Sequence, residues 1–224
     1  FYKLIMKDLI SREKFDFLNV KGVLIDIDDT LYSYELPHKT AVQECFKNFV
    51  DEFSISISLD KFFEAYTRAR AEITESLKAQ GSCRSRLFAF DMLFRKHNID
   101  NSYHHASRYE SIYWESFYTK MKVNENALHF LKECKSHDIV VCAVTDMQAH
   151  IQIKKLQVLN LINYINLLVS SEEAGIEKPN EKIFSLALKK MRLDKDEVVM
   201  IGDSLDKDIK GAENLGIKAI HFKA

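Results

Sequence analysis

The chain has 224 residues and a balanced charge, with 32 lysine and arginine residues against 33 aspartate and glutamate residues, for a net charge of −1. This balance excludes the basic excess that binding along a nucleic-acid backbone requires. Only 6 glycines and 2 prolines are present, which excludes collagen-like and glycine- or proline-rich disordered chains. We therefore expect a soluble globular protein with long helices and short connections.

The cysteines and the apolar stretches predict a cytoplasmic protein. None of the 4 cysteines forms a CxxC pair or has a histidine at zinc-finger spacing, so we interpret them as reduced and buried. The opening FYKLIMKDLI has no uninterrupted apolar region of signal-peptide length. The longest apolar-looking stretch, residues 158–169, is interrupted by asparagines and is too short to span a bilayer.

The first predicted strand is followed by a long helical block. The strand covers residues 22–27 (GVLIDI), a short apolar, β-branched run that ends in carboxylates. No strand signal follows over residues 33–120, where apolar residues recur at helical spacing. The helices predicted there cover residues 41–53, 59–77, 86–97 and 106–117. About 90 residues are far too many for an ordinary crossover, so we interpret the block as an inserted helical domain.

Strands and helices alternate in the rest of the chain. The predicted strands are residues 139–146, 165–170, 198–203 and, more weakly, 218–222. The predicted helices between them are residues 148–159, 181–191 and 207–215, the last ended by Gly216. Near-continuous apolar strands are typical of a parallel sheet that is covered on both faces. The sequence thus predicts an α/β core with a doubly wound parallel sheet, formed by residues 1–32 and 121–224, and a helical domain of residues 33–120.

Acidic and hydroxyl side chains follow several predicted strands at their carboxyl ends, where open α/β sheets bind ligands. They are Asp26, Asp28, Asp29 and Thr30 at the end of the first strand, Thr145 and Asp146 at the end of the second, and Asp203, Ser204 and Asp208 at and beyond the end of the fourth. Lys178 lies in a turn after the third strand, at the same edge. Two carboxylates about 4 Å apart repel by roughly 4 kcal/mol at an effective dielectric constant of 20. This cluster therefore requires a cation, a shared proton or both.

The residue types in this cluster point to phosphoryl chemistry. Oxygen-only ligands favour Mg²⁺, which typically binds carboxylates together with substrate phosphate and water. Lys178 adds a second positive charge, so that an anionic carboxylate can approach phosphorus. One aspartate can attack phosphorus and form an aspartyl-phosphate, while another protonates the leaving oxygen and then activates water. We assign Asp26 as the nucleophile and Asp28 as the acid/base.

Four motifs in this order resemble those of the haloacid dehalogenase-like (HAD) hydrolase superfamily. DIDDTL at residues 26–31 is similar to its first motif, Thr145 after VVCAV to its second, Lys178 within GIEKPNEKIF to its third, and GDSLDKDIKGAENLG to its fourth. The resemblance covers nearly all of residues 20–224. It implies that the helical insert is a type-one cap of a phosphatase.

The resemblance also implies a role for each motif residue. Asp26 would be nucleophile and metal ligand, and Asp28 acid/base, with its backbone carbonyl on the metal. Thr145 and the Asp146 amide would hold the phosphoryl oxygens, and Lys178 would bridge nucleophile and phosphate.

The fourth motif supplies the remaining implied metal ligands. Asp203 would bind Mg²⁺, and Asp208 would support it directly or through water. The dehalogenase branch of the family lacks a carboxylate at the Asp28 position, which argues against dehalogenation. The GIEKPNEKIF stretch looks most like pyrimidine 5′-nucleotidases and sugar-phosphate phosphatases such as N-acylneuraminate-9-phosphatase.

The helical domain carries one candidate for substrate recognition. Arg84 and Arg86 open a predicted helix and could clamp a second anionic group of the substrate. A solvated helix start is the alternative.

We therefore expect a Mg²⁺-dependent phosphomonoester hydrolase that acts on a small phosphorylated metabolite, such as a nucleotide or sugar phosphate. Neither nucleic acid nor a membrane is an expected partner, and the oligomeric state stays open. One alternative is a phosphomutase of the β-phosphoglucomutase type. Another is a non-catalytic regulatory protein that binds phosphate or metal.

Overall fold

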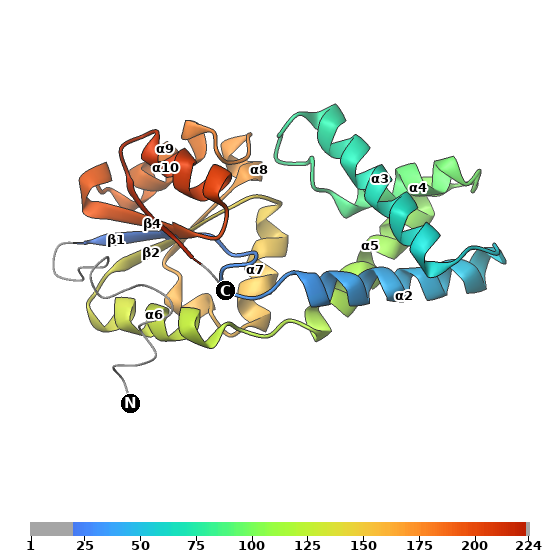
Figure 1. Ribbon diagram of the computed structural model, residues 1–224, viewed down its shortest axis with the longest axis horizontal. Helices are drawn as coiled ribbons and strands as arrows, with labels where there is room; N and C mark the ends of the chain where they lie inside the picture. Colours follow the sequence, from blue (N-terminus) through green and yellow to red (C-terminus); the bar gives the residue numbers. More distant parts are fainter. Residues whose placement is uncertain (1–19, 223–224) are drawn as a thin grey trace. The chain divides into compact units, whose positions relative to one another are not determined.

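The computed structural model describes residues 20–222 and divides into two compact units (Figure 1). One unit is the continuous segment Tyr34–Met121, and the other combines the described residues on either side of it, 20–33 and 122–222. The opening FYKLIMKDLI, for which the sequence predicts no signal-peptide stretch, lies outside the described residues.

A parallel sheet of five strands forms the centre of the second unit. The strands are β1 (Gly22–Ile25), β2 (Val140–Thr145), β3 (Leu167–Ser170), β4 (Val198–Gly202) and β5 (Lys218–His221), in the spatial order β3-β2-β1-β4-β5. From β1 the chain proceeds outward to β2 and β3, and it then returns to β4 on the other side of β1. The direction of winding therefore reverses between β1 and β4, which is where such sheets bind ligands beyond their carboxyl ends.

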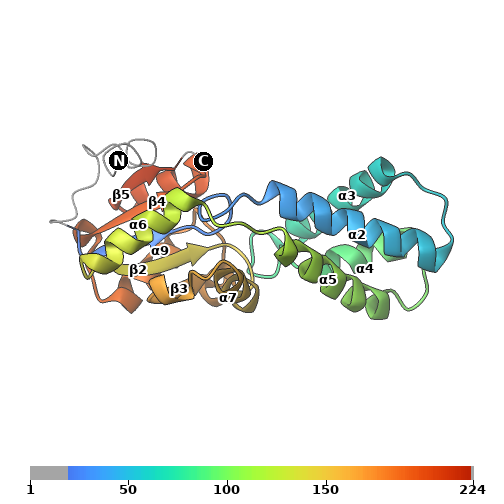
Figure 2. The same cartoon turned by 90° about the horizontal axis from the view of Figure 1, so that it is seen from below.

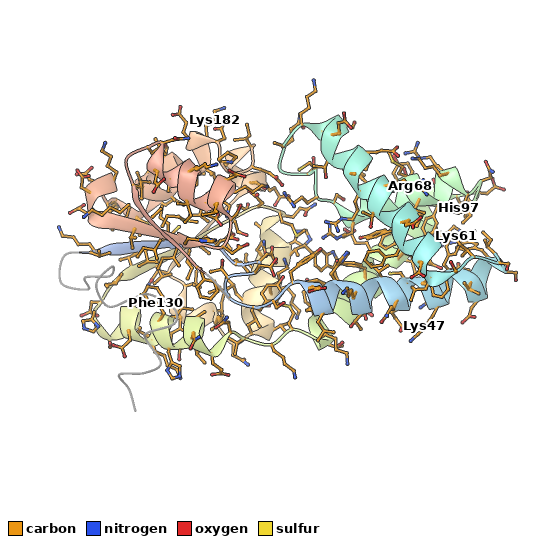
Figure 3. All side chains as sticks on the ribbon, in the orientation of Figure 1. Lys47, Lys61, Arg68, His97, Phe130 and Lys182 are labelled. Carbon is orange, nitrogen blue, oxygen red and sulfur yellow. The ribbon has the colours of Figure 1, made fainter. Side chains whose placement is uncertain are left out.

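Helices cover both faces of this sheet (Figures 1 and 2). On one face lie α6 (Glu125–Ser136) and α7 (Ala149–Val158), and on the other α9 (Glu181–Met191) and α10 (Lys210–Glu213). Shorter pieces are η1 (Ile162–Tyr164), α8 (Ser171–Ala174), η2 (Lys195–Glu197) and the π-helical turn η3 (Leu205–Ile209). Burial on both faces explains why the strands are apolar almost throughout. Core side chains include Leu24, Val144, Phe184 and Met200, with Phe130 of α6 also buried (Figure 3).

The other unit consists of four long helices, which are α2 (Glu35–Phe53), α3 (Leu59–Leu77), α4 (Arg86–Lys96) and α5 (Ser102–Thr119). Two of them begin at serine caps, since the Ser58 and Ser85 side chains accept hydrogen bonds from the backbone of Lys61 and Phe88. Aromatic rings fill the interior and pack against one another at centroid distances of 4.9–6.3 Å, among them Phe49, Phe62, Phe90, Phe94 and Tyr109.

The structure confirms the predicted doubly wound parallel sheet and corrects several element boundaries. Helix α6 was absent from the prediction, although Asn124 caps it with hydrogen bonds from Asn126 and Ala127. Its buried residues Ala127, Phe130, Leu131 and Cys134 recur at helical spacing. The helix after β4 begins with η3 at Leu205, two residues before the predicted start.

The remaining predictions concern buried cysteines and the lack of a membrane-spanning segment. Cys45, Cys83, Cys134 and Cys142 are buried thiols that form no disulfide with one another. Within residues 20–222, no helix is both long and apolar enough to cross a membrane. A cytoplasmic location stays a prediction.

Candidate active site

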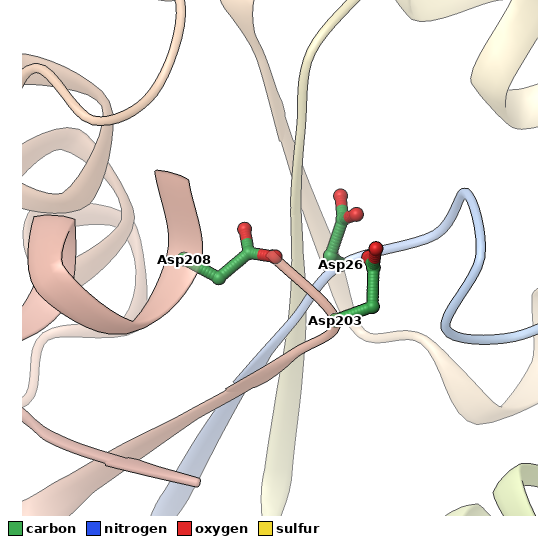
Figure 4. Close-up of side chains that lie close together, drawn as sticks. All are labelled: Asp26, Asp203 and Asp208. Carbon is green, nitrogen blue, oxygen red and sulfur yellow. The ribbon is translucent and has the colours of Figure 1, made fainter. Parts of the chain in front are cut away.

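Three aspartates from separate parts of the chain converge beyond the carboxyl ends of β1 and β4. Asp26 directly follows β1, Asp203 directly follows β4, and Asp208 belongs to η3. One carboxylate oxygen of each lies within 4.8 Å of the others, and the three side chains lie close together (Figure 4). Asp26 and Asp208 are buried, and Asp203 is half-buried.

Backbone geometry places these side chains. The Asp26 N–H donates to the Ile201 carbonyl at 3.0 Å, which continues the β1–β4 pairing into the site. Gly202 leaves room for Asp208, because a Cβ at that position would lie 2.3 Å from an Asp208 carboxylate oxygen. The Asp208 carboxylate also accepts the Ser204 N–H at 3.0 Å, which fixes its orientation.

Lys178 connects two of the three carboxylates. Its Nζ lies 2.7 Å from Asp26 Oδ1 and 2.6 Å from Asp208 Oδ1, and it also donates to the Val144 carbonyl at 2.9 Å. Burial alone would lower the pKa of Lys178, but the Asp26 and Asp208 carboxylates outweigh it and raise the pKa. Lys178 is therefore a permanent cation at the floor of the site.

Burial and neighbouring negative charges disfavour the charged form of two of the carboxylates, Asp26 and Asp203. Burial raises the pKa of Asp26 well above its ordinary range, an increase that Lys178 opposes and that Asp208 and Asp28 reinforce. Burial, together with the Asp208 carboxylate, also raises the pKa of Asp203. Three carboxylates and one ammonium leave a formal charge of −2. The oxygen-only donor set and this charge fit one hard divalent cation such as Mg²⁺.

Asp28 lies in a different set of contacts. Its carboxylate pairs with Lys155 Nζ at 2.6 Å and accepts hydrogen bonds from Gln152 Nε2 at 3.0 Å and from the Tyr32 hydroxyl. Burial alone would raise the pKa of Asp28, but the Lys155 ammonium and these hydrogen bonds outweigh it and lower the pKa.

Sequence reasoning missed both helical partners of Asp28. Lys155 and Gln152 lie on α7 and are fully buried. The sequence did contain an indication of this. Residues three apart lie on the same face of a helix, and the neighbours of Gln152 and Lys155 on that face are apolar, which indicates that the face is covered.

Gln152 joins Asp28 to the end of β2. Its Nε2 also donates to Thr145 Oγ1 at 2.7 Å and to the Asp146 carbonyl at 3.0 Å. The structure thus brings the predicted residues Thr145 and Asp146 to the same edge of the sheet as Asp28. The amide of Gln152 fixes the positions of all three groups relative to one another.

The Asp146 carboxylate is held by its own partners. It accepts the Lys178 N–H at 2.9 Å and pairs with Lys207 Nζ at 2.6 Å. Lys207 in turn pairs with the buried Glu177 at 2.9 Å. Neither Lys207 nor Glu177 was singled out from the sequence, where charged residues of this kind usually indicate solvated surface.

The two predicted arginines belong to the helical unit. Arg86 is the first residue of α4, and Arg84 lies just before its Ser85 cap. Arg86 is only 2% exposed, so the solvated helix start that the sequence left open is wrong for this residue.

Comparison with known proteins places the chain in a family. Residues 20–216 match the haloacid dehalogenase-like hydrolases. The chain therefore belongs to the haloacid dehalogenase-like hydrolase family.

Within this family, several similar proteins are phosphatases. The chain is 28% identical to ribulose-1,5-bisphosphate 5-phosphatase of Halopiger xanaduensis, over 90% of this chain and 84% of the relative. It is 30% identical to glyceraldehyde 3-phosphate phosphatase of Methanopyrus kandleri, over 91% and 84%. The crystal structure of a HAD phosphatase from Thermococcus onnurineus has the same fold, with a TM-score of 0.68, 22% identity and coverage of 91% and 86%. The prediction of a phosphatase of this family is confirmed.

Proposed function

We propose that the protein hydrolyses the phosphomonoester of a small phosphorylated metabolite, with a sugar phosphate as the favoured class, through an aspartyl-phosphate on Asp26. The observation that carries the proposal is the buried cluster in which Lys178 pairs with both Asp26 and Asp208 while Asp203 lies beside them. The relatives named for ribulose bisphosphate and glyceraldehyde 3-phosphate support a sugar phosphate.

In the first step, an Asp26 carboxylate oxygen forms a bond to phosphorus while the bond from phosphorus to the substrate's ester oxygen breaks. The leaving oxygen takes its proton from Asp28. The contacts of Asp28 with Lys155, Gln152 and Tyr32 favour its charged form, so this step requires these contacts to weaken while Asp28 carries the proton.

In the second step, Asp28 accepts a proton from water, whose oxygen attacks phosphorus and releases the Asp26 carboxylate and inorganic phosphate. The charged form of Asp28 that this step needs is the form that Lys155 stabilises. The Thr145 hydroxyl and the Asp146 N–H would hold phosphoryl oxygens at the end of β2, next to Lys178.

A Mg²⁺ ion held by Asp26, Asp203 and Asp208, with the Asp28 carbonyl, would supply positive charge against the phosphoryl oxygens. The desolvated carboxylates with raised pKa values support such a site. We further propose that residues 33–120 serve as the cap of the catalytic core formed by residues 1–32 and 121–224.

The test is release of inorganic phosphate from a panel of triose, pentose and hexose phosphates and nucleotides. Asp26→Asn should lower turnover by a factor on the order of 10³ or more while circular dichroism shows an intact fold. The matched control is Asp206→Asn, because Asp206 is exposed and pairs with the exposed Lys210, four residues along the chain. This variant should turn over substrate as the wild type does.

Three results would overturn the proposal. Wild-type activity in Asp26→Asn would remove the nucleophile assignment. Rearrangement of a sugar phosphate without net phosphate release would indicate a mutase, and no reaction across the panel would indicate a binding protein.

A further inference from the structure

The helical unit contains a buried arginine that pairs with no carboxylate among residues 20–222. Arg86 donates through Nη1 to the Arg84 carbonyl at 2.9 Å and through Nη2 to the Tyr34 hydroxyl at 2.6 Å. Its guanidinium carbon lies 5.1 Å from the ring centre of Tyr113 and 5.4 Å from that of Trp114. Within residues 20–222, the buried Nε atom has no hydrogen-bond partner.

Further polar groups surround this guanidinium. The Tyr113 hydroxyl lies 2.7 Å from His38 Nδ1, and His38 Nε2 lies 3.5 Å from Arg70 Nη1. The buried Tyr66 hydroxyl has no hydrogen-bond partner in the part of the chain that the structure describes. Burial, together with Arg70 and Arg86, lowers the pKa of His38 to about 3, so the ring is neutral and the local potential is positive.

A buried cation without an anion is unfavourable, because it loses hydration that neither hydroxyls nor aromatic faces replace fully. The other buried cations of the described chain avoid this. Lys178 has two carboxylate partners and Lys155 has one. The described residues therefore leave the cluster around Arg86 without a compensating negative charge.

The hydrogen-bond donors of the cluster around Arg86 are of the kinds that bind oxyanions. A guanidinium presents N–H groups in a planar fork that matches carboxylate and phosphate oxygens, and tyrosine hydroxyls add further donors. The half-buried side chains of Tyr34, His38 and Arg70 adjoin the fully buried Arg86 and form the more accessible part of the cluster.

We propose that Tyr34, His38, Arg70, Arg86 and Tyr113 form a binding site for a small oxyanion, of the phosphate or carboxylate class, within the helical unit. This site is additional to the carboxylate cluster proposed for hydrolysis. The oxyanion is either free in solution or an anionic group carried by a phosphorylated metabolite, since both present the same oxygens.

The single tryptophan of the chain provides the test. Trp114 lies against the Arg86 guanidinium, so its fluorescence should change saturably when inorganic phosphate is titrated at constant ionic strength. The titration is done in Asp26→Asn protein with and without Arg86→Met. Loss of the charge-assisted hydrogen bonds should weaken phosphate binding about tenfold or more.

Matched variants separate this result from general effects. Arg68→Met removes an exposed arginine of the same unit (Figure 3) and should leave the titration unchanged. Arg86→Lys keeps the charge but loses the fork, so it should bind more weakly than Arg86, and it remains informative where Arg86→Met fails to fold. The absence of a saturable change in Asp26→Asn protein that keeps Arg86, or equal phosphate binding with and without the Arg86 substitutions, would overturn the proposal.

Steady-state kinetics then distinguish the two sources of the anion. For an anion carried by the substrate, Arg86→Met should raise KM for a sugar bisphosphate and leave KM for the matching monophosphate unchanged. For a free anion, phosphate should modulate turnover non-competitively, and Arg86→Met should abolish that effect. Either result supports the oxyanion site. Because binding is measured in Asp26→Asn, absent turnover would contradict the proposed hydrolysis without affecting this conclusion.

Discussion

Replacing Lys155 by methionine is expected to destabilise the α/β unit, because it removes the cation that Asp28 faces. The Lys155 side chain is 0% exposed, its Nζ lies 2.6 Å from Asp28 Oδ1, and the Asp28 side chain is 26% exposed. Removing one partner of a buried ion pair lowers the free energy of unfolding by about 3–5 kcal/mol. Because water still reaches Asp28, we expect the lower end, about 3 kcal/mol. For a chain of this length, that corresponds to a fall in Tm of about 6–12 °C.

The assay is thermal and urea unfolding of a double-mutant cycle with Asp28→Asn. Removing both charges should recover most of the loss, because the uncharged amide introduced by Asp28→Asn no longer needs the ammonium. Lys154→Met is the matched control, since Lys154 is the exposed neighbour on the same helix, and it should leave Tm unchanged. The reasoning is refuted if Lys155→Met loses less than about 1 kcal/mol, or if the double variant is no more stable than Lys155→Met.

Three shorter predictions concern other parts of the chain. Gly202→Ala places a Cβ 2.3 Å from an Asp208 carboxylate oxygen; urea unfolding should show a loss of about 1–3 kcal/mol, and unchanged stability would contradict the contact. The folded-state pKa of His38, about 3, lies below its unfolded value, so folding stability should fall as pH drops below about 6.5. The loss should reach about 2 kcal/mol at pH 5 and be smaller in His38→Gln, as measured by urea unfolding at both pH values. Mg²⁺ at about 100 times its Kd should stabilise the wild type by about 2.7 kcal/mol and Asp203→Asn less, as read from Tm; equal shifts would argue against this metal site.

The fold and the central carboxylates could be predicted because both depend on short-range patterns. Near-continuous apolar runs identify strands that are buried on two faces, and parallel strands end at one edge of the sheet. Asp26 and Asp203, which directly follow β1 and β4, therefore had to come together. The position of Asp208 followed less directly, because it depends on the π-helical turn η3 and on the absence of a side chain at Gly202.

The partners of Asp28 could not be predicted in the same way. A lysine on an amphipathic helix is ordinarily a surface residue, and Lys155 differs only because α7 packs against the sheet with that face inward. Gln152 is buried for the same reason, one turn away. Which helix face is covered depends on tertiary packing, so the sequence left the Asp28 carboxylate without the cation that lowers its pKa.

The buried cations of the chain differ in how their charge is balanced, and this difference distinguishes two kinds of site. Lys178 lies between Asp26 and Asp208, so two carboxylates of the chain compensate its charge. Lys155 has one carboxylate and also faces the ring of Tyr32 at 5.8 Å. Arg86 contacts the Tyr34 hydroxyl, a backbone carbonyl and two aromatic rings. Since burial disfavours a charge that has no partner of opposite sign, the arginine is the cation whose stabilisation would increase most when an external anion binds.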